Sequence, residues 1–446
     1  MRFVDINNKE SKKILEKIKK NSAMELFDSI PENLKNSSIA LPKAKDEREL
    51  KKSLNHLNAT LNMINFLGAG ACEHFVPEWI NQQLLRAEWY TSYTPYQAEV
   101  AQGNLQALFE FQTMTKSLLG QEIANASMYD GATALAEAVL LAYRVNKKST
   151  VLVSSTIHPH YRDTLKTYLS QTPIEIVTIN FSKEGKICEH SLNYILKSFA
   201  DNICCAAIQT PNFFGLFEDT DYLIEKFKEQ EIFSISVTTD CSALGLMKPL
   251  GDCGFDVSVA DGIGLVGALN MGGPGVGLFA TKKQYLRQIP GRLVGMTTDK
   301  DNNQGFVLTL STREQHIRRE KATSNICTNN NLIAMAFAMT LSSYGKDGFI
   351  DLGYRNIQKT LYLRKKLLEN KITPVFNGEY YNETVIKVPN ASIFLDNAKQ
   401  KNIIAGLHLE EFYPSLNNHI LLATTELHSN DEIDILVNLL KDAINE

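Results

Sequence analysis

A turn around Pro95 gathers the densest group of hydroxyl, amide and aromatic side chains in this chain. Pro95 disfavours helical geometry at Thr94, so the helix that ends near Trp89 must give way to a turn or an extended piece. Hydroxyl and amide groups orient a small polar substrate without adding a fixed charge. The turn is therefore a candidate substrate pocket, and aromatic core packing around an ordinary proline turn is the alternative. The side chains that it would present together are Tyr93, Thr94, Tyr96 and Gln97.

A second candidate is the basic segment 312–328. Its basic residues are Arg313, Arg318, Arg319 and Lys321. Guanidinium groups in such a cluster suit recognition of a carboxylate or of an acidic partner protein. The four-residue spacing of Glu314 and Arg318 equally fits an ordinary solvated helix face. The residues alone leave both interpretations open.

Three further polar residues stand where a cofactor could bind. His158 and Asp240 each follow an apolar, strand-like run, at the carboxyl edge where open α/β sheets bind ligands. An imidazole there could stack on a pyridine ring, and a carboxylate could pair with a pyridinium nitrogen; a loop histidine without chemical role is the alternative. Asp130 is a good N-cap for the alanine-rich helix after it, and free amides at a helix start attract phosphate. The charge of Asp130 would itself repel a phosphate placed on it, so this signal is weak.

The loop after the apolar run 256–260 lacks a lysine. No lysine occurs between Lys248 and Lys282. Gly264 stands in the loop after a strand-like run, where an α/β enzyme that uses pyridoxal phosphate would carry its lysine. Covalent attachment of that cofactor requires a primary amine on a positioned side chain. The chain therefore has the layout for pyridoxal chemistry without the residue that holds the cofactor.

The elements that must position these residues alternate between strands and helices from residue 150 onward. Six short apolar runs lie at 150–154, 174–179, 203–209, 232–237, 256–260 and 276–280. This alternation predicts a mostly parallel sheet covered by helices on both faces, an α/β fold. We expect three parts, namely an N-terminal helical arm at 1–62, a large α/β domain at 63–328 and a small C-terminal α+β domain at 329–446.

Composition narrows the class of protein. The 446 residues include 46 Lys and Arg against 50 Asp and Glu, so no basic excess favours nucleic acid or an anionic membrane. The 7 cysteines form no C-x-x-C pair, which predicts reduced thiols and no metal site. The first ten residues lack the apolar stretch of a signal peptide, and no window is apolar enough to span a bilayer. We expect a cytoplasmic protein.

Several long strings in the correct order resemble the glycine cleavage system P-protein family, and in particular its separate first-subunit chains. The strings are 66–70, 90–97, 102–103, 109–113, 128–137 and 312–328. The resemblance covers essentially the whole chain. The chain departs from the family pattern at Cys72, where an aromatic is expected, and at Thr238-Thr-Asp240, where Val-Ala-Asp is usual.

The resemblance implies a type I fold of pyridoxal-phosphate-dependent transferases and a split P-protein. An α chain such as this one would pair with a lysine-bearing β chain, P-protein subunit 2, in an α2β2 assembly, and the β chain would hold pyridoxal phosphate. The complete enzyme would decarboxylate glycine, release CO2 and pass the aminomethyl group to the lipoyl cofactor of H-protein.

The resemblance also implies site residues. One group would lie at the subunit interface, where it would position the substrate and exclude water. A second group of two residues would lie near the substrate or lipoyl path. The first group is Tyr93, Thr94, Tyr96, Gln97 and Glu99, and the second is Arg313 and His316.

Two alternatives remain open from the sequence. The chain could be a non-catalytic scaffold that only stabilises its partner. It could also be a self-contained pyridoxal-phosphate enzyme that uses Lys248 or Lys282, although both stand outside the expected loop.

Overall fold

The computed structural model describes residues 8–35, 40–57, 63–91, 94–267, 269, 272–324, 326 and 329–445. The chain divides into two units, one ending at residue 62 and the other beginning at residue 63. The described residues of the first unit form four helices, and none of their described side chains is buried. They are the α-helices α1 (Asn8–Lys17) and α2 (Glu47–Leu57) and the 3-10 helices η1 (Ala23–Phe27) and η2 (Glu32–Leu34).

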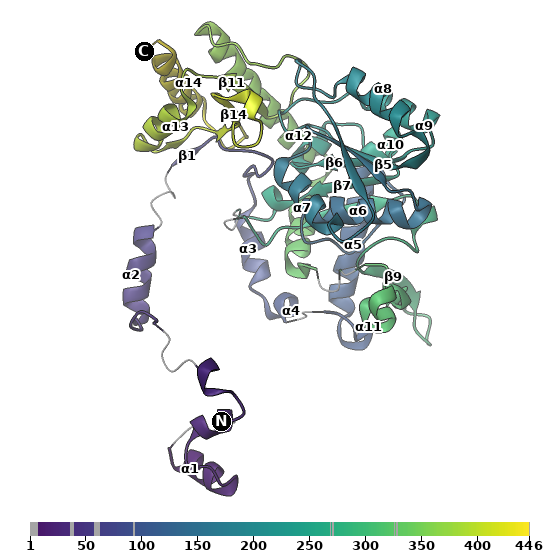
Figure 1. The fold of residues 1–446 in the computed structure, drawn as a ribbon, viewed down its shortest axis with the longest axis vertical. Helices are drawn as coiled ribbons and strands as arrows, with labels where there is room; N and C mark the ends of the chain where they lie inside the picture. The colour runs from purple at the N-terminus through teal and green to yellow at the C-terminus, as the bar shows by residue number, and fades with distance from the viewer. Residues whose placement is uncertain are drawn as a thin grey trace. The chain divides into compact units, whose positions relative to one another are not determined.

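A seven-stranded sheet forms the centre of the second unit (Figure 1). Its strand order is β2-β8-β7-β6-β5-β3-β4, and β3 to β7 all run parallel, whereas β8 runs antiparallel to its neighbours β2 and β7. The strands are β2 (Ile123–Ala124), β3 (Thr150–Ser154), β4 (Glu175–Ile179), β5 (Ile203–Gln209), β6 (Phe233–Thr238), β7 (Val257–Asp261) and β8 (Gly277–Thr281). This confirms the predicted mostly parallel sheet.

Helices cover both faces of this sheet, which is why its strands read as continuous apolar runs. Helices α6 (Gly131–Asn146) and α7 (Pro159–Leu169) pack on one face around Val151 and Val153. The other face carries α8 (Glu189–Ser198), α9 (Thr220–Glu229) and α10 (Leu250–Cys253) around Leu152. It also carries α5 (Gln102–Leu119) and the start of α12 (Asn331–Glu369), which pack on Ala260 and Leu278. The backbone of α12 leaves helical geometry at Gly345, so this element consists of two helices joined at a kink.

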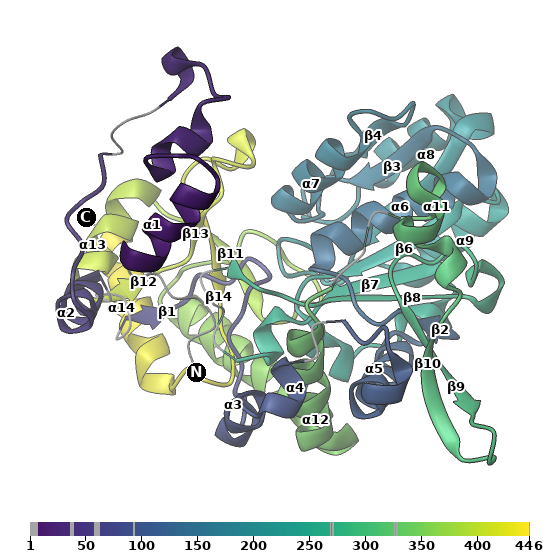
Figure 2. The same cartoon turned by 90° about the horizontal axis from the view of Figure 1, so that it is seen from below.

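A smaller sheet with the order β11-β14-β13 is built from the C-terminal part of the chain. Its antiparallel strands are β11 (Glu383–Lys387), β13 (Leu407–His408) and β14 (His419–Ala423). Helices α13 (Ala391–Gln400) and α14 (Asn430–Asn445) and the second half of α12 share its apolar core. Figure 2 shows these elements beside the large sheet, with α12 reaching both. The pair β1 (Ile64–Asn65) and β12 (Ile403–Ile404) attaches residues 64–65 to this part. The expected three-part division of the chain stays a prediction.

The remaining elements are short. The hairpin of β9 (Leu293–Thr298) and β10 (Gln304–Thr309) projects from the body in Figure 2. The other α-helices are α3 (Glu78–Leu84), α4 (Ala87–Tyr90) and α11 (Gln315–Arg318). The 3-10 helices are η3 (Ala98–Val100), η4 (Ala200–Asn202), η5 (Cys241–Gly245), η6 (Ile263–Leu265), η8 (Lys283–Tyr285), η9 (Ser311–Arg313), η10 (Arg319–Lys321) and η11 (Pro414–Leu416).

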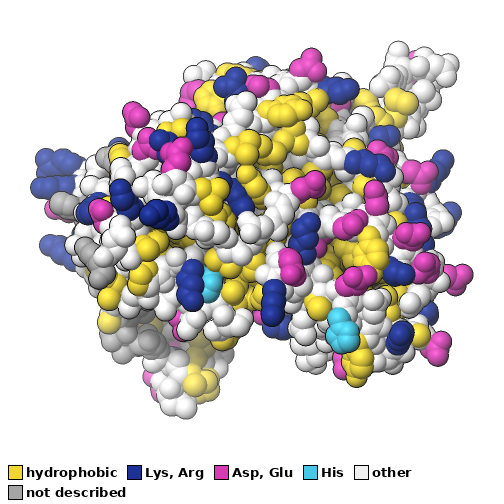
Figure 3. All heavy atoms as spheres, turned by 90° about the horizontal axis from the view of Figure 1, so that it is seen from above, with side chains coloured by type: hydrophobic (Ala, Val, Ile, Leu, Met, Phe, Trp, Pro, Cys, Tyr) yellow, Lys and Arg dark blue, Asp and Glu magenta, His cyan; other side chains and the backbone are white. Residues whose placement is uncertain are grey.

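The surface carries charges of both signs. Figure 3 shows Lys and Arg side chains intermixed with Asp and Glu over one face of the molecule. Such mixing leaves no broad field of one sign on that face. Within the described part of the chain, every helix is too short or too polar to cross a membrane.

Candidate functional site

The polar turn around Pro95 is anchored by the start of the helix that follows it. The side-chain amide of Gln102 donates to the carbonyl oxygens of Ala98 and Phe306, both at 2.8 Å. Its oxygen accepts the Phe306 N–H, also at 2.8 Å. Because Phe306 belongs to β10, these bonds tie the turn to the hairpin. The turn therefore has a fixed position although most of its side chains face solvent.

The predicted turn residues differ in their exposure to solvent. Pro95 is buried and Thr94 is half-buried, while the Tyr96 N–H donates to the Thr94 carbonyl at 2.9 Å. The side chains of Tyr96, Gln97 and Glu99 are at least partly exposed. Tyr93 lies outside the described residues. The turn thus presents polar groups outward.

Tyr96 packs against a buried arginine that sequence reasoning missed. Arg292 is only 4% exposed, and its Cζ lies 5.1 Å from the centre of the Tyr96 ring. Its Nη2 donates to the Tyr96 hydroxyl at 3.4 Å. On another side, the His316 ring meets the Tyr96 ring edge-on, with 5.6 Å between the centroids. The structure therefore brings the predicted residues Tyr96 and His316 together. No motif marked Arg292, because the burial of an arginine just before a strand is not visible in sequence.

Arg313 is directed inward rather than toward the turn. Its Nη1 donates to the Ile289 carbonyl, its Nη2 to the Gly291 carbonyl at 3.1 Å and its Nε to the Leu310 carbonyl at 3.3 Å. Burial lowers the pKa of this guanidinium. Arg313 thus fastens the basic segment to the loop that leads into Arg292. This geometry favours a positioning role over contact with substrate.

Glu314 departs from the predicted solvated helix face because it is buried, whereas residues 315–321, among them Arg318, Arg319 and Lys321, are exposed. Its side chain is only 6% exposed, and α11 spans just Gln315–Arg318. The His316 Nδ1 lies 3.5 Å from the Glu314 Oε2, and neither carboxylate oxygen has a hydrogen-bond partner among the described residues. A buried carboxylate beside an imidazole and a basic loop indicates a site that is completed by further groups.

A second cluster lies at the carboxyl edge of the large sheet, where Asp240 follows β6. Its carboxylate is bound by the His74 Nε2 (3.1 Å), the Ser242 N–H (3.0 Å), the Ser242 hydroxyl (2.6 Å) and the Asn382 amide (2.7 Å). The other ring nitrogen of His74 lies 2.9 Å from the Glu426 carboxylate. Burial opposes the charged imidazole, but Asp240 and Glu426 raise the pKa of His74 to about 10. His74 is therefore a buried cation between two carboxylates.

His158 follows β3 at the same edge, as predicted, and is neutral. Burial lowers its pKa to about 4. Its Nδ1 accepts the His160 N–H at 3.1 Å, and its Nε2 donates to the Ala69 carbonyl at 2.9 Å. Both ring nitrogens are thus bound by the chain's own backbone.

The start of α6 binds two carboxylates. Asp130 caps the helix as predicted, accepting the Thr133 N–H at 2.7 Å. Asp261, the last residue of β7, accepts the Gly131 N–H at 2.8 Å and the Tyr161 hydroxyl at 3.1 Å. Burial raises the pKa of Asp261 to about 6, against the backbone donors that stabilise its charged form. Two of the amides at the helix start, those of Gly131 and Thr133, therefore already have acceptors.

The two lysines that flank Gly264 in the sequence differ in their surroundings. Lys248 is exposed. Lys282 binds Asp256 at 2.6 Å and the Gly254 carbonyl at 3.3 Å, both just before β7 begins. That is the amino end of β7, opposite the edge where Asp240 lies. Among the described residues, no group of three or more His, Cys, Asp or Glu side chains could hold a metal ion.

Comparison with known proteins gives one consistent family. Residues 1–440 match the family model described as glycine cleavage system P-protein. Two relatives, from Carboxydothermus hydrogenoformans and Geobacillus thermodenitrificans, are named "Probable glycine dehydrogenase (decarboxylating) subunit 1". They are 41% and 42% identical to this chain, and each alignment covers 99% of this chain and 99% of the relative.

Solved structures agree. A crystal structure of glycine decarboxylase (P-protein) of the glycine cleavage system, in inhibitor-bound form, is 35% identical with a TM-score of 0.88, covering 99% of this chain and 100% of that one. An alanine–glyoxylate aminotransferase from Nostoc sp. shares the fold at 14% identity and a TM-score of 0.59, over 85% of this chain and 95% of that chain. The fold is the type I fold of pyridoxal-phosphate-dependent enzymes.

Proposed function

This chain belongs to the glycine cleavage system P-protein family, and from this premise we propose that it is the first of two subunits that together act as glycine dehydrogenase (decarboxylating). The observation that carries this proposal is the end-to-end match with relatives named subunit 1, at 41% and 42% identity. The assembled P-protein decarboxylates glycine, releases CO2 and transfers the aminomethyl group. The lipoyl cofactor of H-protein is its proposed acceptor.

The proposed cofactor of the assembly is pyridoxal phosphate, held by the lysine of the second subunit. When bound, it supplies an electron sink for the bond that breaks as CO2 leaves. Gly264 offers no amine, Lys248 is exposed, and Lys282 binds Asp256 at the amino end of β7. These positions argue against the alternative that this chain is a self-contained enzyme of the same class.

Residues of the polar turn are this chain's proposed contribution to the shared pocket. They are Tyr93, Thr94, Tyr96, Gln97 and Glu99, with His316 beside them. Arg292 holds the Tyr96 ring and hydroxyl in place, so the hydroxyl has a defined direction at the surface. A fixed hydroxyl and nearby exposed amide and carboxylate groups can orient glycine and exclude water from a partner's active site. Arg313 stabilises the loop from which Arg292 and His316 project.

Apolar side chains around the turn support an interface with the second subunit. Leu85 and Val100, on either side of the turn, are 78% and 80% exposed, and Tyr90 and Tyr96 are about half exposed. Exposed apolar groups of this size mark protein–protein contacts when they lie next to one another in a folded chain. An α2β2 assembly is the proposed form.

The test of this proposal is reconstitution. This chain, a lysine-bearing second subunit and lipoylated H-protein are mixed, and release of labelled CO2 from carboxyl-labelled glycine is measured. We expect release from the complete mixture and none when either subunit is omitted. Release from the second subunit and H-protein alone, at the full rate, would contradict the proposal.

The scaffold alternative is tested in the same assay with Tyr96→Phe. This change removes the hydroxyl bound to Arg292 and keeps the exposed ring. We expect a lower kcat in the reconstituted enzyme with unchanged co-purification of the two subunits. An unchanged kcat would favour the scaffold. The matched control is Tyr194→Phe, because Tyr194 is an exposed tyrosine on α8.

A further inference from the structure

We propose that side chains and backbone of this chain fill the place where the type I fold holds pyridoxal phosphate, so that this chain folds with an internal substitute for the cofactor and does not bind it. Four positions in this part of the fold can be compared with the groups that would bind the cofactor. They are the carboxylate for the ring nitrogen, the histidine beside the ring, the helix start for the phosphate and the position of the lysine. The inference rests on the fold and on contacts within this chain, and it is independent of the proposed activity.

The ring-nitrogen position is occupied by His74. Asp240 would pair with a pyridinium nitrogen, but here its two oxygens are bound by His74, Ser242 and Asn382. The imidazole of His74 thus offers Asp240 the cationic N–H that the cofactor ring would offer. A buried carboxylate without such a partner is costly, which explains why a cation remains at this position.

The ring-side histidine is likewise engaged by the protein. His158 donates to the carbonyl of Ala69, which lies in the same segment as His74. The backbone of that segment therefore runs past the position where a cofactor ring would stack.

The phosphate position is filled by carboxylates. The amides of Thr133 and Gly131 point to Asp130 and Asp261, at 2.7 and 2.8 Å. A phosphate would have to displace both acceptors and would meet their negative charge. The helix start therefore repels the group that its geometry would otherwise attract.

The lysine position has no room for a side chain. A Cβ built on Gly264 would overlap the carbonyl oxygen of Cys72 and would lie 3.0 Å from the Cδ2 of His74. Any larger residue at 264 requires the segment 68–74 to move. A side chain at position 264 and the segment 68–74 in its present place therefore exclude each other.

The segment 68–74 is held firmly where it lies. Glu383 accepts the N–H groups of Ala69 and Gly70 at 2.6 and 3.3 Å, and burial raises the pKa of this carboxyl to about 8. Gly70 has a φ of 77°, and a Cβ there would come within 2.7 Å of the Thr239 Cβ, so only glycine allows this approach.

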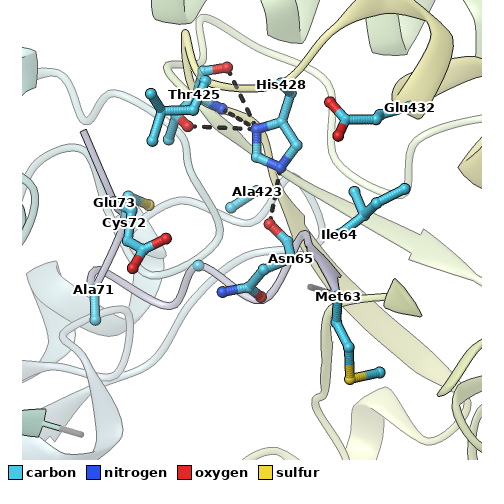
Figure 4. A pocket seen from close by; sticks show the side chains of 12 residues that line it. Met63, Ile64, Asn65, Ala71, Cys72, Glu73, Ala423, Thr425, His428 and Glu432 are labelled. Carbon is cyan, nitrogen blue, oxygen red and sulfur yellow. Dashed lines mark hydrogen bonds between the residues drawn. The ribbon is translucent and has the colours of Figure 1, made fainter. Parts of the chain in front are cut away.

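The small sheet fixes the residues that lead into the segment. Phe66 is bonded to Ala423 through its carbonyl, and Asn65 to His428 at 2.8 Å. Figure 4 shows a pocket beside the Asn65–His428 contact, lined by Asn65, Cys72, Glu73 and His428 among others. Asp240, His158 and Asp261 do not line it.

The experiment uses the full chain and pyridoxal phosphate as the probe. Wild-type protein is titrated with the cofactor to millimolar concentration, and the thermal unfolding midpoint and the absorbance of the bound ring are followed. Gly264→Lys is then treated with cofactor and borohydride, and adducts are mapped by peptide mass. Gly103→Lys is the matched control, because a Cβ at this exposed glycine meets no atom within 4 Å.

We expect no saturable binding and no shift of the unfolding midpoint for the wild type. Gly264→Lys should unfold at a lower temperature than Gly103→Lys, with no more adduct at residue 264 than at residue 103. Failure of Gly264→Lys alone to fold would also support the filled position. Saturable binding of one cofactor per wild-type chain, or a stoichiometric adduct at position 264 of a folded Gly264→Lys variant, would overturn the proposal. None of these outcomes depends on glycine decarboxylation, so they are distinct from a failure of the proposed function.

Discussion

Replacing His74 by glutamine tests the buried charge at the edge of the sheet. His74→Gln removes the only cation that Asp240 and Glu426 contact among the described residues and leaves an amide between two carboxylates. Removing one partner of a buried ion pair costs about 3–5 kcal/mol. The raised pKa gives a similar upper value, since a shift from 6.5 to about 10 corresponds to about 5 kcal/mol at roughly 1.4 kcal/mol per unit. We expect the free energy of unfolding to fall by about 3–5 kcal/mol at pH 6.

The pH dependence gives a sharper expectation. A histidine whose pKa is raised in the folded state contributes stability below its unfolded value of 6.5 and loses it as the pH rises through about 10. The difference in unfolding free energy between wild type and His74→Gln should therefore shrink between pH 6.5 and pH 10, by at most about 1.4 kcal/mol per unit. Asp240 stays ionised in this range because His74 and Ser242 lower its pKa against the effect of burial.

Other titrating groups around His74 are present in both proteins. Glu426 and Asp240 bond to the ring, Cys72 and Tyr381 interact with Asp240, and Glu383 lies near them with a pKa of about 8. Groups whose pKa does not depend on His74 contribute equally to both proteins, and their contributions cancel in the difference. The remaining slope then reports His74.

The assay is urea unfolding of the full chain, followed by circular dichroism at pH 6 to 9. His190→Gln is the control, because His190 is an exposed histidine on α8 and should change stability by less than about 0.5 kcal/mol. A difference that does not vary with pH, or a loss at His74 no larger than at His190, would refute the assignment of a buried imidazolium.

Three further changes probe the other contacts. Arg292→Lys loses the planar guanidinium that both stacks on Tyr96 and donates to its hydroxyl. We expect a several-fold lower kcat in the reconstituted enzyme, with the unfolding free energy reduced by only about 1 kcal/mol. An equal kcat would show that Tyr96 needs no such support. Arg313→Met leaves three backbone carbonyls without their donor, and chemical unfolding should reveal a loss of about 2–4 kcal/mol; a neutral result would mean that the loop repacks. Asp261→Asn removes a carboxyl whose pKa is raised from 3.8 to about 6. The wild type should therefore lose stability relative to this variant as the pH rises from about 4 to about 6. Parallel profiles of unfolding free energy against pH would contradict the raised pKa.

Much of the sheet could be predicted from sequence because its strands are buried on both faces. The apolar runs at 150–154, 203–209, 232–237 and 256–260 coincide with β3, β5, β6 and β7 to within one residue at each end. A continuous apolar run does not reveal strand direction, so the antiparallel course of β8 was not predicted. The hairpin of β9 and β10 was missed because much of each strand is exposed or half-buried and carries no continuous apolar run.

The sites were harder to predict, for a related reason. Tyr96 and His316 were identified from unusual strings of residues, and the structure brings their rings together. Arg292 and His74 were not identified, since an isolated arginine or histidine becomes informative only with its tertiary neighbours. Asp240 immediately precedes η5, Asn382 immediately precedes β11, and Glu426 follows β14, so the residues around His74 come from three places far apart in the chain.

Asp240 illustrates how a residue of catalytic type can have a structural task. In the sequence, Asp240 follows a strand-like run, where a carboxylate that pairs with a cofactor ring is expected. Because the chain has no lysine at the expected position, no cofactor is expected to be attached there for Asp240 to bind. In the structure it accepts bonds from His74, Ser242 and Asn382, and thereby joins the large sheet, the segment 68–74 and the small sheet. Replacing Asp240 would leave a buried imidazolium with half of its counter-charge. The carboxylate therefore has structural partners within this chain, and its presence alone does not indicate a cofactor site.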